Sequence, residues 1–244
     1  METSNRSEDN CRMELCRRYF FKDCECRVLS SPNFDLKSGK VALTFGGAGN
    51  TPLATNIDDS PALDFRRKLL DKGYAILIPF CGGVSWGCME ASTTTVHALE
   101  HLEHDAGLTI PQRMPVVGFS MGGLNALMFA ARHPERVSKV AEFFGAINLA
   151  ELTQRYPVIN ELYPNEEAMK KSTPLNYLPT LAKFPIRIYH GDQDQLIPLA
   201  WSSNLEKRLK EHGANVQFVV VPNIGHSNAI LQPTGDDLIE FLTT

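Results

Sequence analysis

Residues 115–134 read Pro-Val-Val-Gly-Phe-Ser-Met-Gly-Gly-Leu-Asn-Ala-Leu-Met-Phe-Ala-Ala-Arg-His-Pro, and this stretch decides the fold. An apolar run rich in valine is followed by a glycine-flanked turn and then by an apolar helical stripe that ends before a proline. The pattern predicts a buried strand, a tight turn with Ser120 at its apex, and a helix. Unpaired N–H groups at the start of that helix, including the Met121 amide, would face an anion that forms at Ser120. An ordinary strand-to-helix turn is the alternative.

Length and composition favour one domain with one core. The chain has 244 residues, of which 43% are hydrophobic and 21% are charged, and its net charge is −4. We expect a mobile N-terminal arm over residues 1–17 and a single domain over residues 18–244. Lysines and arginines do not cluster among aromatic residues, so neither nucleic acid nor an anionic membrane is the expected partner. A small-molecule substrate fits better, and we expect a monomer or a small homo-oligomer.

The N-terminal sequence and the cysteines indicate the compartment. Residues 1–10 are polar and acidic, unlike a secretory signal, and no apolar run approaches the roughly 18 residues of a membrane span. We therefore expect a cytoplasmic protein whose cysteines remain thiols. A zinc site built from the four N-terminal cysteines is an alternative, but their spacing matches no established zinc pattern. The six cysteines are Cys11, Cys16, Cys24, Cys26, Cys81 and Cys88.

A glycine-rich loop follows the apolar segment 41–45. Its sequence, Gly46-Gly-Ala-Gly-Asn50, would bring backbone amides close to a ligand at the point where a strand leaves the sheet. We interpret it as the second half of an oxyanion-binding site. A dinucleotide-binding loop is the alternative, but the glycines lack G-x-G-x-x-G spacing and no helix follows directly. No cofactor is therefore expected.

Apolar runs alternate with helical patterns along the rest of the chain. An antiparallel hairpin is predicted over residues 19–30, and one or two short helices over residues 149–180, where a small insertion forms either a lid or a side crossover. Continuous apolar strands that alternate with helices predict a mostly parallel sheet covered on both faces. The further strands are predicted at 74–80, 137–145, 183–191 and 216–221, and the helices at 61–73, 91–104, 201–212 and 236–242.

The helix predicted at residues 91–104 contains His97-Ala-Leu-Glu-His101, which matches the H-x-x-E-H zinc-peptidase pattern. At about 100° per residue, His97, His101 and His104 fall on one side and the apolar residues on the other. The histidines therefore face outward, where a catalytic zinc would have no cleft. We predict no metal.

Chemistry-bearing residues follow several predicted strands. Because parallel strands end at one edge of a sheet, Ser120, Asp192 or Asp194, and His226 should converge with the glycine-rich loop. A serine nucleophile needs an imidazole to take its proton, and the imidazole needs a carboxylate to orient it. Aromatic residues at the same edge would form a partly apolar pocket. Those we expect to bind substrate are Phe80, Trp86, Phe144 and Tyr156. For Trp86, which lies in a glycine-rich strand exit, a packing role is the alternative.

From about residue 41 onward the chain resembles an α/β-hydrolase of the compact carboxylesterase or peptidase-like type. The resemblance rests on Gly118-Phe-Ser-Met-Gly-Gly123, His133-Pro-Glu-Arg-Val137, His190-Gly-Asp-Gln-Asp194 and Gly225-His226. It implies that Asp194, the D of H-G-x-x-D, is the acid, since no carboxylate stands at the exit of the strand ending at residue 145. Asp192 is the fallback.

At the oxyanion loop the resemblance is incomplete, because glycine replaces the histidine of the H-G-x-G that many relatives carry. The amide of Ala48 should serve there, and an alignment one residue earlier would select Gly47.

These observations predict a cofactor-free serine hydrolase that cleaves a carboxylic ester through an acyl-enzyme on Ser120. His226 would act as the base and Asp194 would orient it, while the Met121 and Ala48 amides hold the oxyanion. Activity should fall as the pH drops and His226 gains a proton. The same residues could serve a thioesterase, an amidase or an acyltransferase, or remain in a protein that only binds a small ligand.

Overall fold

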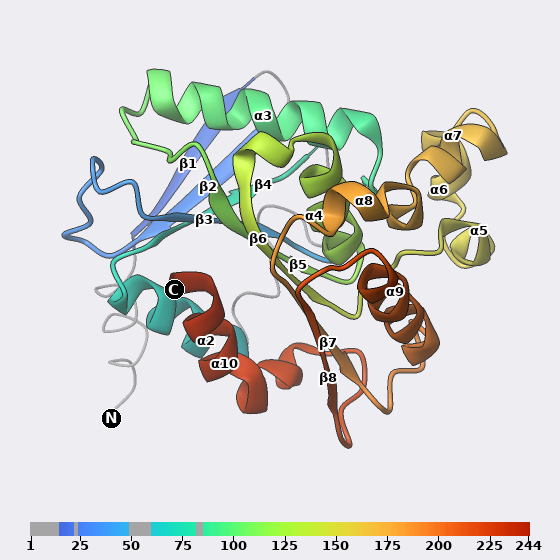
Figure 1. The fold of residues 1–244 in the computed structure, drawn as a ribbon. Coiled ribbons are helices and arrows are strands. Elements are labelled where there is room, and N and C mark those ends of the chain that lie inside the picture. Colours follow the sequence, from blue (N-terminus) through green and yellow to red (C-terminus); the bar gives the residue numbers. More distant parts are fainter. Residues whose placement is uncertain (1–14, 22–23, 49–59, 82–84) are drawn as a thin grey trace, which may run out of the picture.

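The computed structural model describes residues 15–21, 24–48, 60–81 and 85–244. Its centre is an eight-stranded sheet with the order β1-β2-β4-β3-β5-β6-β7-β8 (Figure 1). The β1–β2 and β2–β4 pairs are antiparallel and every other pair is parallel, which confirms the predicted fold class. The strands are Leu15–Phe21 (β1), Cys24–Ser30 (β2), Val41–Phe45 (β3), Ala75–Pro79 (β4), Met114–Phe119 (β5), Val137–Phe143 (β6), Ile186–Gly191 (β7) and Val216–Val221 (β8).

The N-terminal hairpin is longer than predicted. Strand β1 begins at Leu15, which pairs with Ser30, so three residues that we assigned to the arm belong to the sheet. Part of the reason is an ion pair that short-range periodicity does not reveal. Arg18 Nε lies 2.5 Å from Glu25 Oε1 on the neighbouring strand. The rest of the predicted arm, residues 1–14, lies outside the described residues.

Helices cover both faces of the sheet, as predicted. Helices α2 (Ser60–Asp71) and α10 (Leu231–Thr243) pack on one face, where Leu69 and Leu238 are fully buried in one apolar cluster (Figure 1). Side chains from four helices share a second cluster on the other face. These helices are α3 (Met89–His104), α4 (Met121–Arg132), α8 (Leu178–Leu181) and α9 (Leu199–Glu211).

Residues 115–134 form the predicted strand, turn and helix, and α4 is buried over almost its whole length. Helix α10 starts five residues before the predicted position 236. Its first turn contains Pro233, which we did not include, although proline is tolerated there because the first helical N–H groups have no partner. Short 3₁₀ turns occur at Pro134–Arg136 and Asn228–Ile230.

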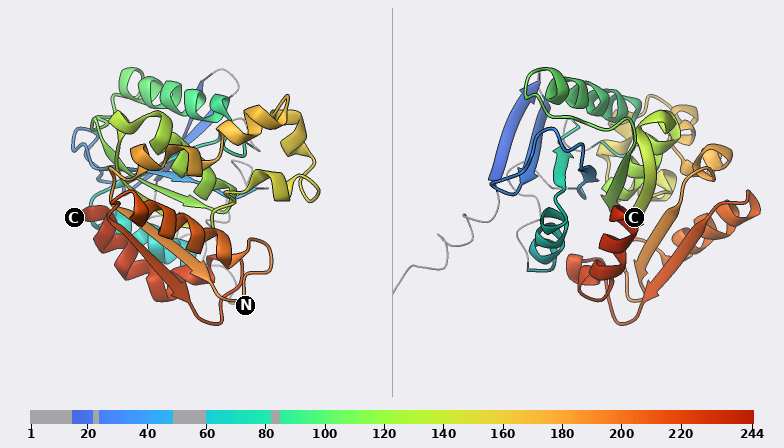
Figure 2. Two further views of the ribbon diagram at one scale, coloured as in Figure 1. Left: turned by 45° about the vertical axis from the view of Figure 1, so that its right-hand side comes forward. Right: turned by 60° about the vertical axis from the view of Figure 1, so that its left-hand side comes forward.

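The segment predicted as an insertion consists of short helices. They are α5 (Leu149–Leu152), α6 (Val158–Leu162), α7 (Glu166–Lys171) and a 3₁₀ turn at Pro174–Tyr177. Figures 1 and 2 show them grouped beside α4 and α8 at one end of the sheet. Their apolar side chains share a third cluster with Trp86 and Leu124. None of the helices that the structure describes is long and apolar enough to cross a membrane.

Candidate active site

Ser120 occupies a strained turn between β5 and α4. Its φ of 57° and ψ of −118° lie in a region that residues other than glycine seldom adopt. The flanking glycines make this turn possible. A Cβ atom at Gly118 would lie 2.0 Å from the Gly122 carbonyl oxygen, and one at Gly122 would lie 2.2 Å from the Phe45 carbonyl oxygen. The backbone of the turn is therefore held tightly against the end of β3.

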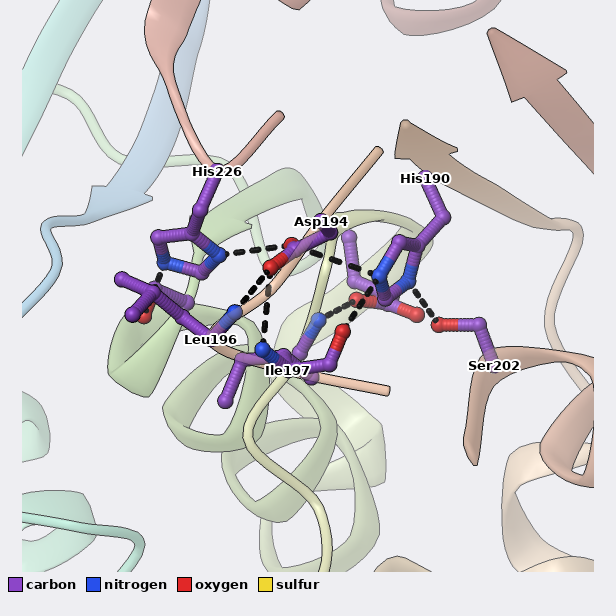
Figure 3. Close-up of polar contacts among 9 residues, drawn as sticks. His190, Asp194, Leu196, Ile197, Ser202 and His226 are labelled. Carbon is purple, nitrogen blue, oxygen red and sulfur yellow. Dashed lines mark hydrogen bonds and ion pairs between the residues drawn. The ribbon is translucent and has the colours of Figure 1, made fainter. Parts of the chain in front are cut away.

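The structure brings together Ser120, His226 and Asp194 from the ends of β5, β8 and β7. The Ser120 Oγ lies 2.9 Å from His226 Nε2. On the other side of the ring, His226 Nδ1 lies 2.7 Å from Asp194 Oδ2 (Figure 3). The alternative acid, Asp192, is exposed at the surface, where its Oδ1 accepts the Asn223 N–H. Of the two aspartates, Asp194 is therefore the one that reaches the imidazole.

The Asp194 carboxylate is fully buried and held at both oxygens. Its Oδ1 accepts the backbone N–H groups of Leu196 and Ile197 at 2.8 and 2.9 Å. Burial disfavours the charged form, but hydrogen bonds from His190, His226 and the Ile197 amide outweigh it and hold the pKa of Asp194 well below its ordinary value. The carboxylate therefore stays ionised throughout the neutral range.

A cavity of about 320 Å³ opens at Ser120 and His226. Two of the four aromatic residues expected to bind substrate, Phe144 and Tyr156, line it. The candidate oxyanion residues Gly47 and Ala48 line it as well. Met121 is the first residue of α4, so its amide stands at the helix N-terminus beside Ser120. The last two residues of the predicted loop, Gly49 and Asn50, lie outside the described residues.

Trp86 and Phe80 are not among the described residues that line the cavity. The Trp86 side chain is fully buried, and its ring packs behind Tyr156 with 4.7 Å between the ring centroids. Its carbonyl oxygen accepts the Tyr163 hydroxyl at 2.7 Å. The Phe80 amide bonds to Glu25 of the hairpin, away from the serine. Trp86 therefore supports a wall of the cavity rather than forming it.

Sequence reasoning missed four polar residues of the cavity wall, which are Thr44, Arg66, Ser227 and Asn228. Of these, Thr44 on β3 and Arg66 on α2 are more than nine-tenths buried. Arg66 could have been found, because it stands three residues from both Leu63 and Leu69 and so falls on the apolar stripe of its helix. Thr44 gives no such signal, since it reads as one more β-branched residue in a buried strand.

Glu142 was also missed, because β6 ends at Phe143 and the carboxylate stands just before the exit that we searched. Its side chain is fully buried beneath the Ser120 turn, and its Oε2 accepts the Gly145 N–H at 2.7 Å. Burial raises the pKa of Glu142 to about 7, although the neighbouring His190 and the Gly145 hydrogen bond oppose that rise. Glu142 therefore changes charge near neutral pH.

The variant Glu142→Gln should gain stability relative to the wild type as the pH rises. The Glu142 pKa is higher in the folded state than in the unfolded chain, so its stabilising contribution is present below about pH 4.5 and is lost as the pH rises through about 7. Ionising this carboxyl in the fold costs about 3 kcal/mol at most. Urea unfolding of both proteins between pH 5 and 8 measures the difference. The exposed Glu161→Gln is the control and should show no trend; a flat difference for Glu142→Gln would contradict the prediction.

The histidines set aside in the sequence lie away from the cavity on α3. His101 Nδ1 contacts the Asp105 carboxylate, and His104 Nδ1 lies 2.5 Å from it. Within the described ranges, no group of three or more histidine, cysteine, aspartate or glutamate side chains could hold a metal ion. Cys16, Cys26, Cys81 and Cys88 are thiols; Cys11 and the Cys24 side chain lie outside the described part of the chain.

The sheet order, the strained turn at Ser120 and the position of His226 after the last strand define an α/β-hydrolase fold. The sequence model of the dienelactone hydrolase family matches residues 82–237. The chain belongs to this family.

Two relatives are similar over part of their length. Acyl-protein thioesterase 1 of Neurospora crassa is 29% identical over 147 residues, which cover 60% of this chain and 51% of that protein. The uncharacterized peptidase YuxL of Bacillus subtilis is 25% identical over 125 residues, which cover 48% of this chain and 19% of that protein. The matches thus span about half of the first relative and a fifth of the second.

Solved structures match almost the whole chain. Est1E from Butyrivibrio proteoclasticus superposes with a TM-score of 0.71 at 15% identity, covering 93% of this chain and 96% of that one. An S-formylglutathione hydrolase from Agrobacterium tumefaciens gives 0.72 at 16% identity, covering 94% and 93%. At such low identity these likenesses show the fold alone.

Proposed function

We propose that this protein is a serine hydrolase that cleaves a carboxylic ester of a small to medium substrate through an acyl-enzyme on Ser120. One observation carries the proposal: the hydrogen-bonded series from Ser120 Oγ to His226 at 2.9 Å and from His226 to Asp194 at 2.7 Å, which opens into a cavity. A serine hydroxyl is a weak nucleophile, and this arrangement is the one that activates it. Membership of a hydrolase family supports the same reaction.

The proposed reaction has two halves. Ser120 Oγ attacks the carbonyl carbon while His226 Nε2 takes the hydroxyl proton, and Asp194 stabilises the imidazolium that forms. The amides of Met121 and of Ala48, or of Gly47, donate hydrogen bonds to the oxyanion, each contributing about 3 kcal/mol in known systems. His226 then gives its proton to the departing alcohol. Water attacks the acyl-enzyme in the same way and releases the acid.

A thioester is the second candidate substrate, because the chemistry at Ser120 would be unchanged and the Neurospora crassa relative is an acyl-protein thioesterase. The cavity of about 320 Å³ suits an acyl or leaving group of modest size. We propose a small-molecule substrate, and action in the cytoplasm, which the thiol state of the described cysteines supports.

A fluorophosphonate probe tests the proposal directly, because it phosphonylates a serine only where a base activates the hydroxyl. We expect covalent labelling of the native protein, located at Ser120 by peptide mass spectrometry, and no labelling after denaturation. Competition by short p-nitrophenyl esters, matched thioesters and amides would then rank the acyl and leaving groups. A folded protein that neither reacts with the probe nor turns over any of these compounds would instead be a small-ligand binding protein on the same fold.

A further inference from the structure

His190 stands at the end of β7 beside the candidate acid, and its side chain is fully buried. One ring nitrogen, Nε2, lies 3.0 Å from the Ile197 carbonyl oxygen and 3.3 Å from Asp194 Oδ2. The other, Nδ1, lies 2.8 Å from the hydroxyl of Ser202 on α9. Figure 3 shows this second imidazole on the side of Asp194 opposite His226.

These contacts fix the tautomer of His190. A carbonyl oxygen only accepts hydrogen bonds, so Nε2 must carry a proton that it donates to the Ile197 carbonyl, and the Asp194 carboxylate lies 3.3 Å from the same N–H group. In the neutral ring, Nδ1 is then an acceptor, and the Ser202 hydroxyl can donate to it. Both ring nitrogens are thus satisfied in the interior without a second proton.

One oxygen of the Asp194 carboxylate consequently lies between two imidazoles. Oδ2 lies 2.7 Å from His226 Nδ1 and 3.3 Å from His190 Nε2, while Oδ1 is occupied by two backbone amides. The Phe144 ring packs against both imidazoles, with centroids 4.3 Å from His226 and 6.3 Å from His190. The Asp194 carboxylate therefore has little freedom to turn away from His226.

We propose that His190 is a positioning residue for the Asp194 carboxylate. Its Nε2–H group restrains Asp194 Oδ2 and offsets part of the negative charge that acts on His226. This inference rests on the proposed function. An Asp194 carboxylate that also interacts with His190 is a weaker acceptor for His226, so His190 weakens the stabilisation of the His226 cation. It thereby sets the pH at which activity falls on the acid side.

Three titratable groups face His190. They are Asp194 and His226 at the strand exits and Glu142 on β6, which interacts electrostatically with His190. Helix α9 presents the neutral Ser202. Because Glu142 itself titrates near neutral pH, the pH profiles of activity should be measured in both the wild-type and the Glu142→Gln backgrounds.

The experiment compares His190→Phe, which keeps a planar ring without a donor, with His190→Gln, whose side-chain amide can replace the Nε2–H. For His190→Phe we expect kcat/KM for a p-nitrophenyl ester to fall about tenfold or more. The midpoint of the acid limb of the kcat/KM profile should move to higher pH by about one unit. Without the contact to His190, the Asp194 carboxylate stabilises the His226 cation more strongly. His190→Gln should keep a midpoint near that of the wild type.

A merely structural role would lower activity without moving the midpoint. An unmoved midpoint in folded His190→Phe, or equal displacement in the Phe and Gln variants, would overturn the inference. Should His190→Phe fail to fold, Ser202→Ala is tested instead, because it removes the hydroxyl that contacts His190 Nδ1. A shift of the acid-limb midpoint to higher pH, smaller than about one unit, supports the positioning role. An unchanged midpoint refutes it. An inactive, unlabelled wild type would instead refute the proposed function.

Discussion

Replacing Ser120 by alanine is expected to lower kcat for a p-nitrophenyl ester by about 10⁴-fold to 10⁶-fold. The change removes the single oxygen that lies 2.9 Å from His226 Nε2, and the described part of the cavity presents no other hydroxyl within hydrogen-bonding distance of that nitrogen. Alanine fits the same backbone, since the close contacts of the turn fall on Gly118 and Gly122. Initial rates and thermal unfolding of purified protein measure both effects.

The matched control is Ser203→Ala, which removes an exposed hydroxyl from α9 and should leave the rate unchanged. The Ser120→Ala protein should melt within a few degrees of the wild type, because a hydroxyl that lines an open cavity contributes little to stability. Retention of more than a tenth of the wild-type rate by folded Ser120→Ala would refute the acyl-enzyme on Ser120.

Replacing Gly122 by alanine should disrupt both the fold and the site. The added methyl group would lie 2.2 Å from the Phe45 carbonyl oxygen and 2.6 Å from that of Gly46, and these backbone atoms cannot move aside as a side chain can. Overpacking of this kind costs about 3 kcal/mol or more. Relief of the clash would push the loop carrying Gly47 and Ala48 away from Ser120, so activity should fall as well. Urea unfolding and ester turnover measure the two consequences.

Gly235→Ala is the matched control for Gly122→Ala. Gly235 lies within α10, and a methyl group there would meet no atom within 4 Å. Alanine in a helix is favoured over glycine by up to about 1 kcal/mol, so this variant should be as stable as the wild type or slightly more stable. Equal stability of the Gly122→Ala and Gly235→Ala proteins would show that the turn at Ser120 is not packed as described.

The sequence predicted the parts of this protein that depend on short-range pattern. The strand, turn and helix around Ser120 needed only local periodicity and glycine spacing. The convergence of His226 with Asp192 or Asp194 followed from the common edge at which parallel strands end, and the family resemblance favoured Asp194. The position of Trp86 could not be predicted in this way. A glycine-rich strand exit allows a tryptophan to turn toward solvent or core, and contacts with Tyr156 and Tyr163, about 70 residues later in the sequence, decide between them.

His190 shows a different limit of sequence reasoning. It was visible in the H-G-x-x-D motif, but a histidine in a buried strand can face either side. Only the structure reveals that its ring meets Ser202 and the Ile197 carbonyl as well as Asp194. Glu142 was hidden for a related reason, since the exact residue at which a strand ends is the least certain part of any assignment.

Arg132 at the end of α4 has a consequence for how substrates reach the cavity. Its guanidinium donates to the Gly87 and Cys88 carbonyl oxygens and to the hydroxyls of Ser92 and Ser172, which joins α3 and the segment after α7 to α4. Swinging the short helices outward would break the partly buried, charge-assisted bond from Arg132 to Ser172. We therefore expect the short helices to stay packed against α4 while substrate and product exchange.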